Sequence, residues 1–166
     1  MPAKLKHPLV AVIKNIGPGA AAAVPAVIKA YQHERGGKKH HAAFAEALAA
    51  IGPAAAPAVP VLEQAANSYN WASGPGVYAK GSTVYALYMI RGHEADLQSL
   101  ADLLPVTMYR CGLKTARLLN KLGHKARPVE DKVRKQLELE TAKEKKNLEF
   151  IGVLESILKN SDSGTE

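Results

Sequence analysis

Residues 16–27 read Ile-Gly-Pro-Gly-Ala-Ala-Ala-Ala-Val-Pro-Ala-Val, and residues 51–62 repeat the pattern as Ile-Gly-Pro-Ala-Ala-Ala-Pro-Ala-Val-Pro-Val-Leu. The offset is 35 residues throughout, without a gap, and Ile, Gly, Pro, Val and Pro return in the same places. A fixed period of this length is the signature of repeat architectures, in which each repeat is one supersecondary unit. The pattern therefore predicts a repeated structural corner.

Two weaker copies follow along the chain. Residues 122–128 (Leu-Gly-His-Lys-Ala-Arg-Pro) begin 71 residues after the second copy, close to two further periods. Residues 92–97 (Gly-His-Glu-Ala-Asp-Leu) lie between them, displaced by a few residues. We attribute the displacement to an inserted Gly/Pro/Ser-containing loop at residues 70–76. Four units then fill most of the chain.

Each copy has the chemistry of a corner between two helices. An apolar-periodic stretch ends at Ile-Gly, where glycine supplies the positive φ that closes a helix. Pro18 and Pro53 then prevent the first helix from continuing, because proline lacks the N–H that a helix interior needs. Pro25 and Pro60 are expected in or just before the first turn of the second helix. Two helices joined in this way form an αα-hairpin.

The predicted architecture is an all-α, right-handed α-solenoid of about four helical hairpins with a C-terminal capping helix, because one hairpin cannot bury its apolar stripe alone. Its second helices are expected to begin near residues 21, 57, 94 and 127. The predicted boundaries, within a single domain of residues 1–160, are hairpins at 4–33, 38–69, 77–104 and 108–141, a cap helix at 143–159 and a frayed tail at 161–166.

The composition supports this architecture. Of 166 residues, 47% are apolar but only 5% are aromatic, so the core is expected to consist of Ala, Val, Leu and Ile, which suits closely approaching helices. A single cysteine excludes an intramolecular disulfide, and we expect a cytoplasmic protein without a membrane-spanning segment or a secretory leader. The net charge is +7, with +6 of it in residues 1–92, which favours acidic partners.

The pattern Ile-Gly-Pro-x-Ala-x-x-Ala-Val-Pro-x-Leu resembles the HEAT-repeat superfamily, specifically the short bacterial repeats called phycobilisome-lyase-like HEAT repeats. The resemblance is closest over residues 4–69, less close over 106–141 and weakest over 77–104. It implies a HEAT-like fold. Members of that family are mostly protein-interaction scaffolds, and a minority are enzymes or nucleic-acid binders, so the resemblance indicates fold more strongly than function.

The sequence offers little for catalysis or metal binding. His33-Glu34 and His93-Glu94 are similar to the dipeptides of the HEAT-repeat di-iron hydroxylase of deoxyhypusine, but that enzyme uses four such pairs, and these two differ in repeat phase. His40-His41 are expected in a flexible basic loop. Cys111 is expected as a small core residue. We therefore predict no enzyme activity, no metal, no cofactor and no small-molecule substrate.

A series of basic residues follows helical spacing, with separations of 4, 3, 4 and 4: Arg110, Lys114, Arg117, Lys121 and Lys125. The spacing predicts one face of one helix, with Leu118 and Leu122 on its buried flank. No carboxylate interrupts the segment, so the face is predicted to dock phosphate or an acidic protein. The alternative is a solvated face whose countercharges lie on the next helix, for example Glu130, Asp131 or Glu138.

Aromatic residues cluster around the predicted inserted loop. The set is Tyr69, Trp71, Tyr78, Tyr85 and Tyr88, which holds the single Trp and four of the six Tyr. Tyr and Trp combine a large apolar area with a polar group and often anchor interfaces, so the set is predicted to bind a partner. The alternative is that the rings fill space where the repeat changes register.

Taken together, these features predict a non-catalytic protein-interaction scaffold, or an accessory subunit of a larger assembly, with a partner that has an acidic surface. The alternative is a nucleic-acid-binding protein that uses its basic face. A groove-gripping DNA glycosylase is disfavoured because residues 69–90 contain no Asp or Glu to act in a cleft.

Overall fold

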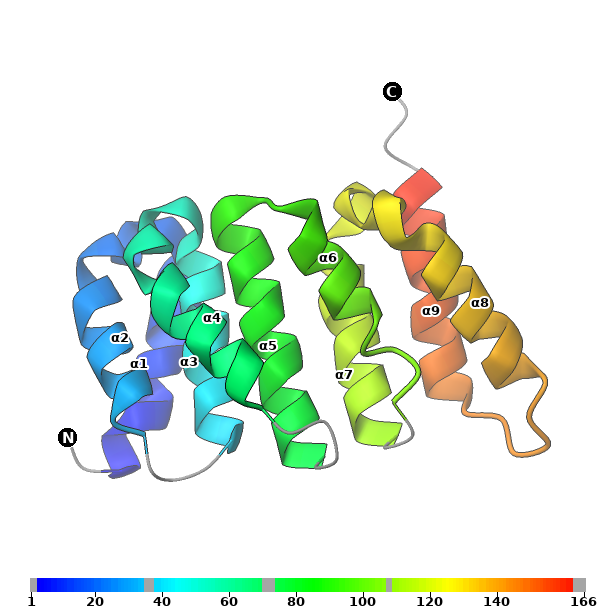
Figure 1. Cartoon of the computed structure of the whole chain (residues 1–166), viewed down its shortest axis with the longest axis horizontal. Coiled ribbons are helices and arrows are strands. Elements are labelled where there is room, and N and C mark those ends of the chain that lie inside the picture. The colour runs from blue at the N-terminus through cyan, green and yellow to red at the C-terminus, as the bar shows by residue number, and fades with distance from the viewer. Residues whose placement is uncertain (1–2, 35–37, 70–73, 107–108, 163–166) are drawn as a thin grey trace. The chain divides into compact units, whose positions relative to one another are not determined.

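The structure, a computed structural model, describes residues 3–34, 38–69, 74–106 and 109–162 (Figure 1). Over these ranges the chain forms α-helices and 3-10 helices joined by turns, with no β-strand, so the predicted all-α class is confirmed. Tertiary contacts divide the chain into two compact units, Met1–Asp96 and Leu97–Glu166. The single domain expected over residues 1–160 stays a prediction.

The first unit contains, in chain order, α1 (Ala3–Ile16), the 3-10 helix η1 (Gly17–Ala23), α2 (Val24–Gln32), α3 (Lys38–Ile51), the 3-10 helix η2 (Gly52–Ala58), α4 (Val59–Ser68) and α5 (Gly74–Arg91). α3 packs against α1 and against α5. α2 packs on α3, and α4 packs on α5, so the unit has two layers, as Figure 1 shows.

The corners of the first unit contain the predicted glycines with positive φ. Gly17 and Gly52 follow the last residues of α1 and α3, and their φ angles are +62° and +74°. A side chain would be strained in this left-handed region, which explains the glycines. The two corners η1 and η2 also contact each other, so the repeated sequence forms repeated structure. The weaker copies agree, because Gly92 and Gly123 have φ angles of +69° and +56°.

The second helices begin later than predicted, because each corner contains a 3-10 helix. α2 begins at Val24 rather than near residue 21, and α4 begins at Val59 rather than near 57. Pro25 and Pro60 lie in the first turns of α2 and α4, as expected. Each proline lacks the N–H that would bond to the carbonyl four residues earlier, so an α-helical pattern cannot reach further back.

In the first unit, α3 contributes alanines to the core together with larger apolar residues. Ala45, Ala47, Leu48 and Ile51 are fully buried in the helix that packs between α1 and α5. Methyl side chains let these backbones approach closely without voids. Glu46 adds polar links on the same helix, because its carboxylate accepts hydrogen bonds from Lys14 Nζ of α1 (2.7 Å) and Ser82 Oγ of α5 (3.0 Å).

The division between the units falls inside α6 (Glu94–Ala101). The second unit then contains α7 (Tyr109–Asn120), the 3-10 helix η3 (Gly123–Val129), α8 (Glu130–Thr141) and α9 (Leu148–Asp162). α9 packs against α7, α8 and η3. It buries Leu154 and Ile157, two of the residues whose spacing predicted this helix.

α9 is shifted along the chain relative to the predicted 143–159. It begins at Leu148, because the Asn147 side chain caps it by accepting a hydrogen bond from the Phe150 N–H at 3.2 Å. It also continues to Asp162, into the segment expected to be frayed. The rest of that tail lies outside the described residues.

Two stretches, Leu9–Gln32 and His40–Ser68, are long and apolar enough to cross a membrane by length and composition alone. Buried helices of soluble proteins and signal sequences pass the same test, so it is weak evidence. Each stretch is interrupted by a left-handed glycine and a 3-10 helix. The expected absence of a membrane span stays a prediction.

Candidate functional site

An apolar groove of about 540 Å³ lies in the first unit, a volume typical of ligand sites. Its walls include Leu9, Val10 and Ile13 from α1, and Ala26, Val27 and Ala30 from α2. Phe44 of α3 also lines it. Ala26 and Ala30 have small side chains, so this part of the wall admits another backbone at short distance.

The outer surface of α1 extends this apolar groove. Val10 and Ile13 are buried, but Leu9, Val12 and Ile16 are exposed by 42%, 50% and 54%. At 100° per residue, the exposed residues lie beside the groove-lining ones, and Leu9 belongs to both sets. Lys14 and Asn15 lie on the opposite side of α1, but its apolar stripe is wider than the part that is buried. The exposed side of α1 therefore has the composition of an interface.

Sequence reasoning missed this surface, although its signal is present. The apolar residues of α1 occupy positions 9, 10, 12, 13 and 16, which is too broad a stripe for a helix with one buried face. No surface role was predicted for these residues from the sequence. Only packing shows that α3 covers one part of the stripe and leaves the other exposed.

α2, one wall of the groove, is anchored by a buried polar cluster. The Tyr31 hydroxyl hydrogen-bonds to the Tyr69 hydroxyl (2.7 Å) and to Thr83 Oγ1 of α5 (3.2 Å). The His41 ring of α3 stacks on Tyr31, with ring centroids 4.9 Å apart. Burial, and then the neighbouring Tyr69, raise the pKa of Tyr31 well above its usual value of 10. The cluster thus joins three helices and the end of α4.

The predicted aromatic patch is divided by the structure. Tyr69 and Tyr85 are buried, so their rings serve packing within the first unit, which was the alternative interpretation. Tyr78 and Tyr88 are partly exposed on α5. Trp71 lies outside the described residues. Partner binding by the aromatic patch stays a prediction, for which Tyr78 and Tyr88 are the described residues with exposed surface.

The predicted basic face does not lie on one helix. α7 ends at Asn120 and the chain turns at Gly123, so Lys121 follows the helix and Lys125 belongs to η3. The prediction of a single helical face from Arg110 to Lys125 is therefore wrong, because the left-handed glycine ends the helical phase. The side chain of Arg110 lies outside the described ones, and that of Lys114 is half-buried.

The countercharge of this surface also differs from the expected ones. Arg117 pairs with Glu149 of α9, whereas Glu130 pairs with Arg134 on its own helix. What remains as a basic surface is the η3 corner, where Lys121, Lys125 and Arg127 are exposed. Leu118 and Leu122 are buried, as predicted.

The structure places the candidate histidines in the first turn of α3 and on the surface. His40 and His41 lie in the first turn of α3, so the predicted loop is wrong, and His40 Nδ1 is 3.3 Å from the buried carboxylate of Glu34. His33 and His93 are exposed. Cys111 is buried, as expected for a core residue. Among the described residues, no three His, Cys, Asp or Glu side chains form a group that could hold a metal ion.

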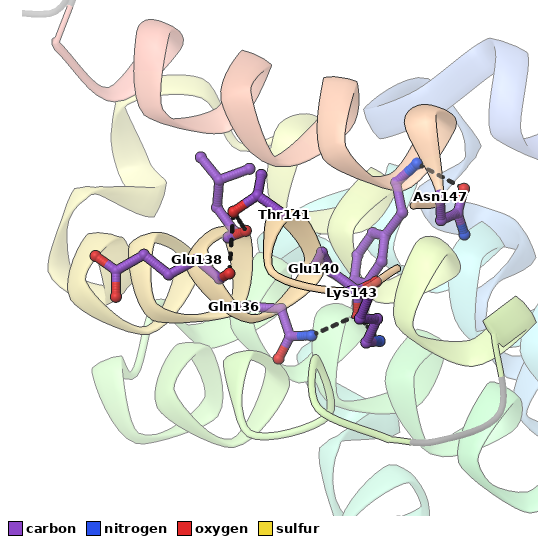
Figure 2. Close-up of polar contacts among 8 residues, drawn as sticks. Gln136, Glu138, Glu140, Thr141, Lys143 and Asn147 are labelled. Carbon is purple, nitrogen blue, oxygen red and sulfur yellow. Dashed lines mark hydrogen bonds and ion pairs between the residues drawn. The ribbon is translucent and has the colours of Figure 1, made fainter. Parts of the chain in front are cut away.

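A second hollow, of about 420 Å³, lies in the second unit beside the α8–α9 corner. Its polar residues bond to one another, as Figure 2 shows: the buried Glu140 carboxylate accepts from Gln136 Nε2 (3.0 Å) and from Lys143 Nζ (2.5 Å). The Thr141 hydroxyl donates to backbone carbonyls of α8, and Asn147 caps α9. Thr141 thus supplies a donor near the end of α8, where the last carbonyls lack helical partners.

Comparison of the chain with protein-family models, with curated proteins and with solved structures found no match. The function is therefore argued from the surfaces themselves. The groove of the first unit is the stronger candidate, because its apolar lining continues onto exposed residues of α1.

Proposed function

We propose that this chain is a non-catalytic protein-interaction scaffold of HEAT-like hairpins, which binds a helix of a partner protein in the groove between α1 and α2. The observation that carries the proposal is the exposure of Leu9, Val12 and Ile16 beside that groove. Burying such residues is the main source of affinity at helix-in-groove interfaces.

The repeated corner supports the HEAT-like part of the proposal. Left-handed glycines at positions 17, 52, 92 and 123 each follow a helix, and the corners at Gly17, Gly52 and Gly123 continue as 3-10 helices. A common corner at each of these points is what a solenoid of about four hairpins requires, and α9 would be its capping helix. Helical repeats of this kind present extended surfaces suited to binding proteins.

A site-specific photocross-linker tests the proposal. We would replace Val12 by benzoylphenylalanine, irradiate cells that express the full chain, and identify adducts by mass spectrometry. A matched variant carries the probe at Ala54, an exposed alanine of the η2 corner. We expect a discrete protein adduct from position 12, resistant to nuclease and absent from position 54. Identical adduct patterns at the two positions, or none at position 12, would refute the groove as an interface.

The alternative function, nucleic-acid binding, has the exposed basic residues of the η3 corner in its favour: Lys121, Lys125 and Arg127. Binding of this kind depends steeply on salt because phosphate contacts release counterions. Lys121→Glu combined with Arg127→Glu should abolish retention on heparin if this function holds. If the wild type is retained only weakly on heparin and the variant is retained equally, nucleic-acid binding by this corner is refuted.

A further inference from the structure

The segment that supplies α1, η1 and α2 carries positive charge and no negative charge in its sequence. Residues 1–33 contain Lys4, Lys6, Lys14 and Lys29 and no Asp or Glu. Lys29 is exposed and lines the groove, whereas Lys14 is engaged with Glu46 of α3. The first acidic residue of the chain, Glu34, is buried. A surface of one sign favours a partner of the opposite sign and raises its rate of association.

The shape of the apolar surface selects a helix as the partner segment. Along α1, Leu9, Val12 and Ile16 are separated by 3 and 4 residues, and Leu5 extends the series in sequence by a further 4. Alternating separations of 3 and 4 are the spacing with which two helices pack side by side. The opposite wall holds Ala23, Ala26 and Ala30, whose methyl groups allow a second helix to lie close to α2.

A second copy of this chain is a poor occupant. If two copies paired through this surface, the same positively charged segment would face itself, which is unfavourable for like charges. α9, the helix nearest the C-terminus, has no comparable apolar stripe to offer, because its Leu154 and Ile157 are buried within its own unit. Its outward positions include Glu155 and Lys159. The occupant therefore comes from another protein.

From this juxtaposition of a helix-packing stripe, a wall with several alanines and the exposed Lys29, in a segment that holds four lysines and no carboxylate of its own, we infer that the groove takes an acidic amphipathic helix. Its apolar residues would follow the spacing i, i+3, i+7 and pack on Leu9, Val12 and Ile16. Glutamate or aspartate residues would flank them on the side of Lys29. The inference rests on the proposed function and adds the chemical class of the partner.

Defined peptides test the inference on the full chain. The probe is a fluorescently labelled amphipathic peptide of about 20 residues, long enough to be helical, with Leu at the apolar positions and Glu at the flanking ones. A second peptide carries Lys in place of every Glu. Binding is measured by fluorescence anisotropy at about 0.15 M ionic strength and at higher salt. Vesicles containing an anionic phospholipid form a third arm.

Two variants locate the site. Ala26→Glu places a carboxylate in the groove, and Ala54→Glu makes the same change at an exposed alanine in the η2 corner of the same unit. We expect the acidic peptide to bind at least about tenfold more tightly than the basic one, with weaker binding at high salt. Ala26→Glu should lower its affinity about tenfold, and Ala54→Glu should leave it unchanged.

The outcomes separate this inference from the function on which it rests. If both peptides bind equally and Ala26→Glu abolishes that binding, the inference of an acidic partner is refuted. The proposed function, binding of a helix in the groove, would still hold. Binding of neither peptide would overturn the inference. Binding of the vesicles but not of the acidic peptide, again lost in Ala26→Glu, would show that the surface contacts a membrane.

Discussion

Replacement of Gly52 by alanine tests the repeated corner directly. Gly52 has φ +74°, and a Cβ added there would meet no heavy atom within 4 Å, so the substitution changes backbone strain without a steric clash. An L-residue in the left-handed region costs about 1–2 kcal/mol. The smaller conformational entropy of alanine in the unfolded chain offsets about 0.4–1 kcal/mol of this. We therefore expect Gly52→Ala to lower the free energy of unfolding by about 1 kcal/mol.

Gly152 supplies the matched control. It lies inside α9, and an added Cβ would again meet no heavy atom within 4 Å, but its φ is that of an ordinary helical residue. There, alanine is the better helix former, and Gly152→Ala should raise the free energy of unfolding by about 0.5–1 kcal/mol. The same chemical change is thus expected to have opposite signs at the two glycines.

The assay is urea denaturation of the full chain followed by far-UV circular dichroism. For a slope of about 1–3 kcal/mol per molar urea, a loss of 1 kcal/mol lowers the midpoint by roughly 0.5 M. Gly52 belongs to the unit Met1–Asp96 and Gly152 to the unit Leu97–Glu166, and we expect the two substitutions to move the urea midpoint in opposite directions. A midpoint for Gly52→Ala at or above the wild-type value, with an unchanged slope, would refute the left-handed corner.

Three further predictions concern buried polar groups. Because burial raises the pKa of Tyr31, the folded chain keeps a proton that the unfolded chain loses; its contribution to stability is complete below about pH 10 and declines above it. Tyr31→Phe should make the alkaline decline of the unfolding free energy shallower, and an unchanged pH profile by circular dichroism would contradict this. Arg91 pairs with the buried carboxylate of Asp96, so Arg91→Ala should lower stability by about 1–3 kcal/mol. Arg134→Ala, which removes an exposed pair within α8, should cost about 0.3–0.5 kcal/mol; equal shifts of the two thermal midpoints would be contrary evidence. Glu140→Ala should lower stability by about 1–3 kcal/mol, because a buried amide of α8 loses its acceptor; an unaltered urea midpoint would show that the pair contributes nothing.

Local chemistry made the helices and corners predictable. Glycine at positions 17, 52, 92 and 123 allows a positive φ that other residues resist, and Pro18 and Pro53 after the first two prevent the preceding helices from continuing. These constraints act within a few residues, so the positions of the corners can be predicted from the sequence pattern. The 3-10 geometry of the corners was not anticipated, because proline excludes the α-helical bond without specifying what replaces it.

The candidate site was less predictable, because the type of a residue does not determine which other helix covers its side chain. Tyr69 and Tyr85 were expected on a surface and are buried, whereas Val12 and Ile16, for which no surface role was predicted, are exposed. Arg117 found its countercharge on α9, 32 residues away, rather than on the helix that follows.

The sequence by itself therefore determined the all-α class, the places where the chain turns and the apolar character of each helix. Those properties depend on backbone dihedral preferences and on side-chain hydrophobicity, which are local. Only the tertiary structure decided that α3 covers part of α1 and leaves Leu9, Val12 and Ile16 beside an open groove. Exposure depends on contacts between residues far apart in the chain, and no spacing within one helix encodes them.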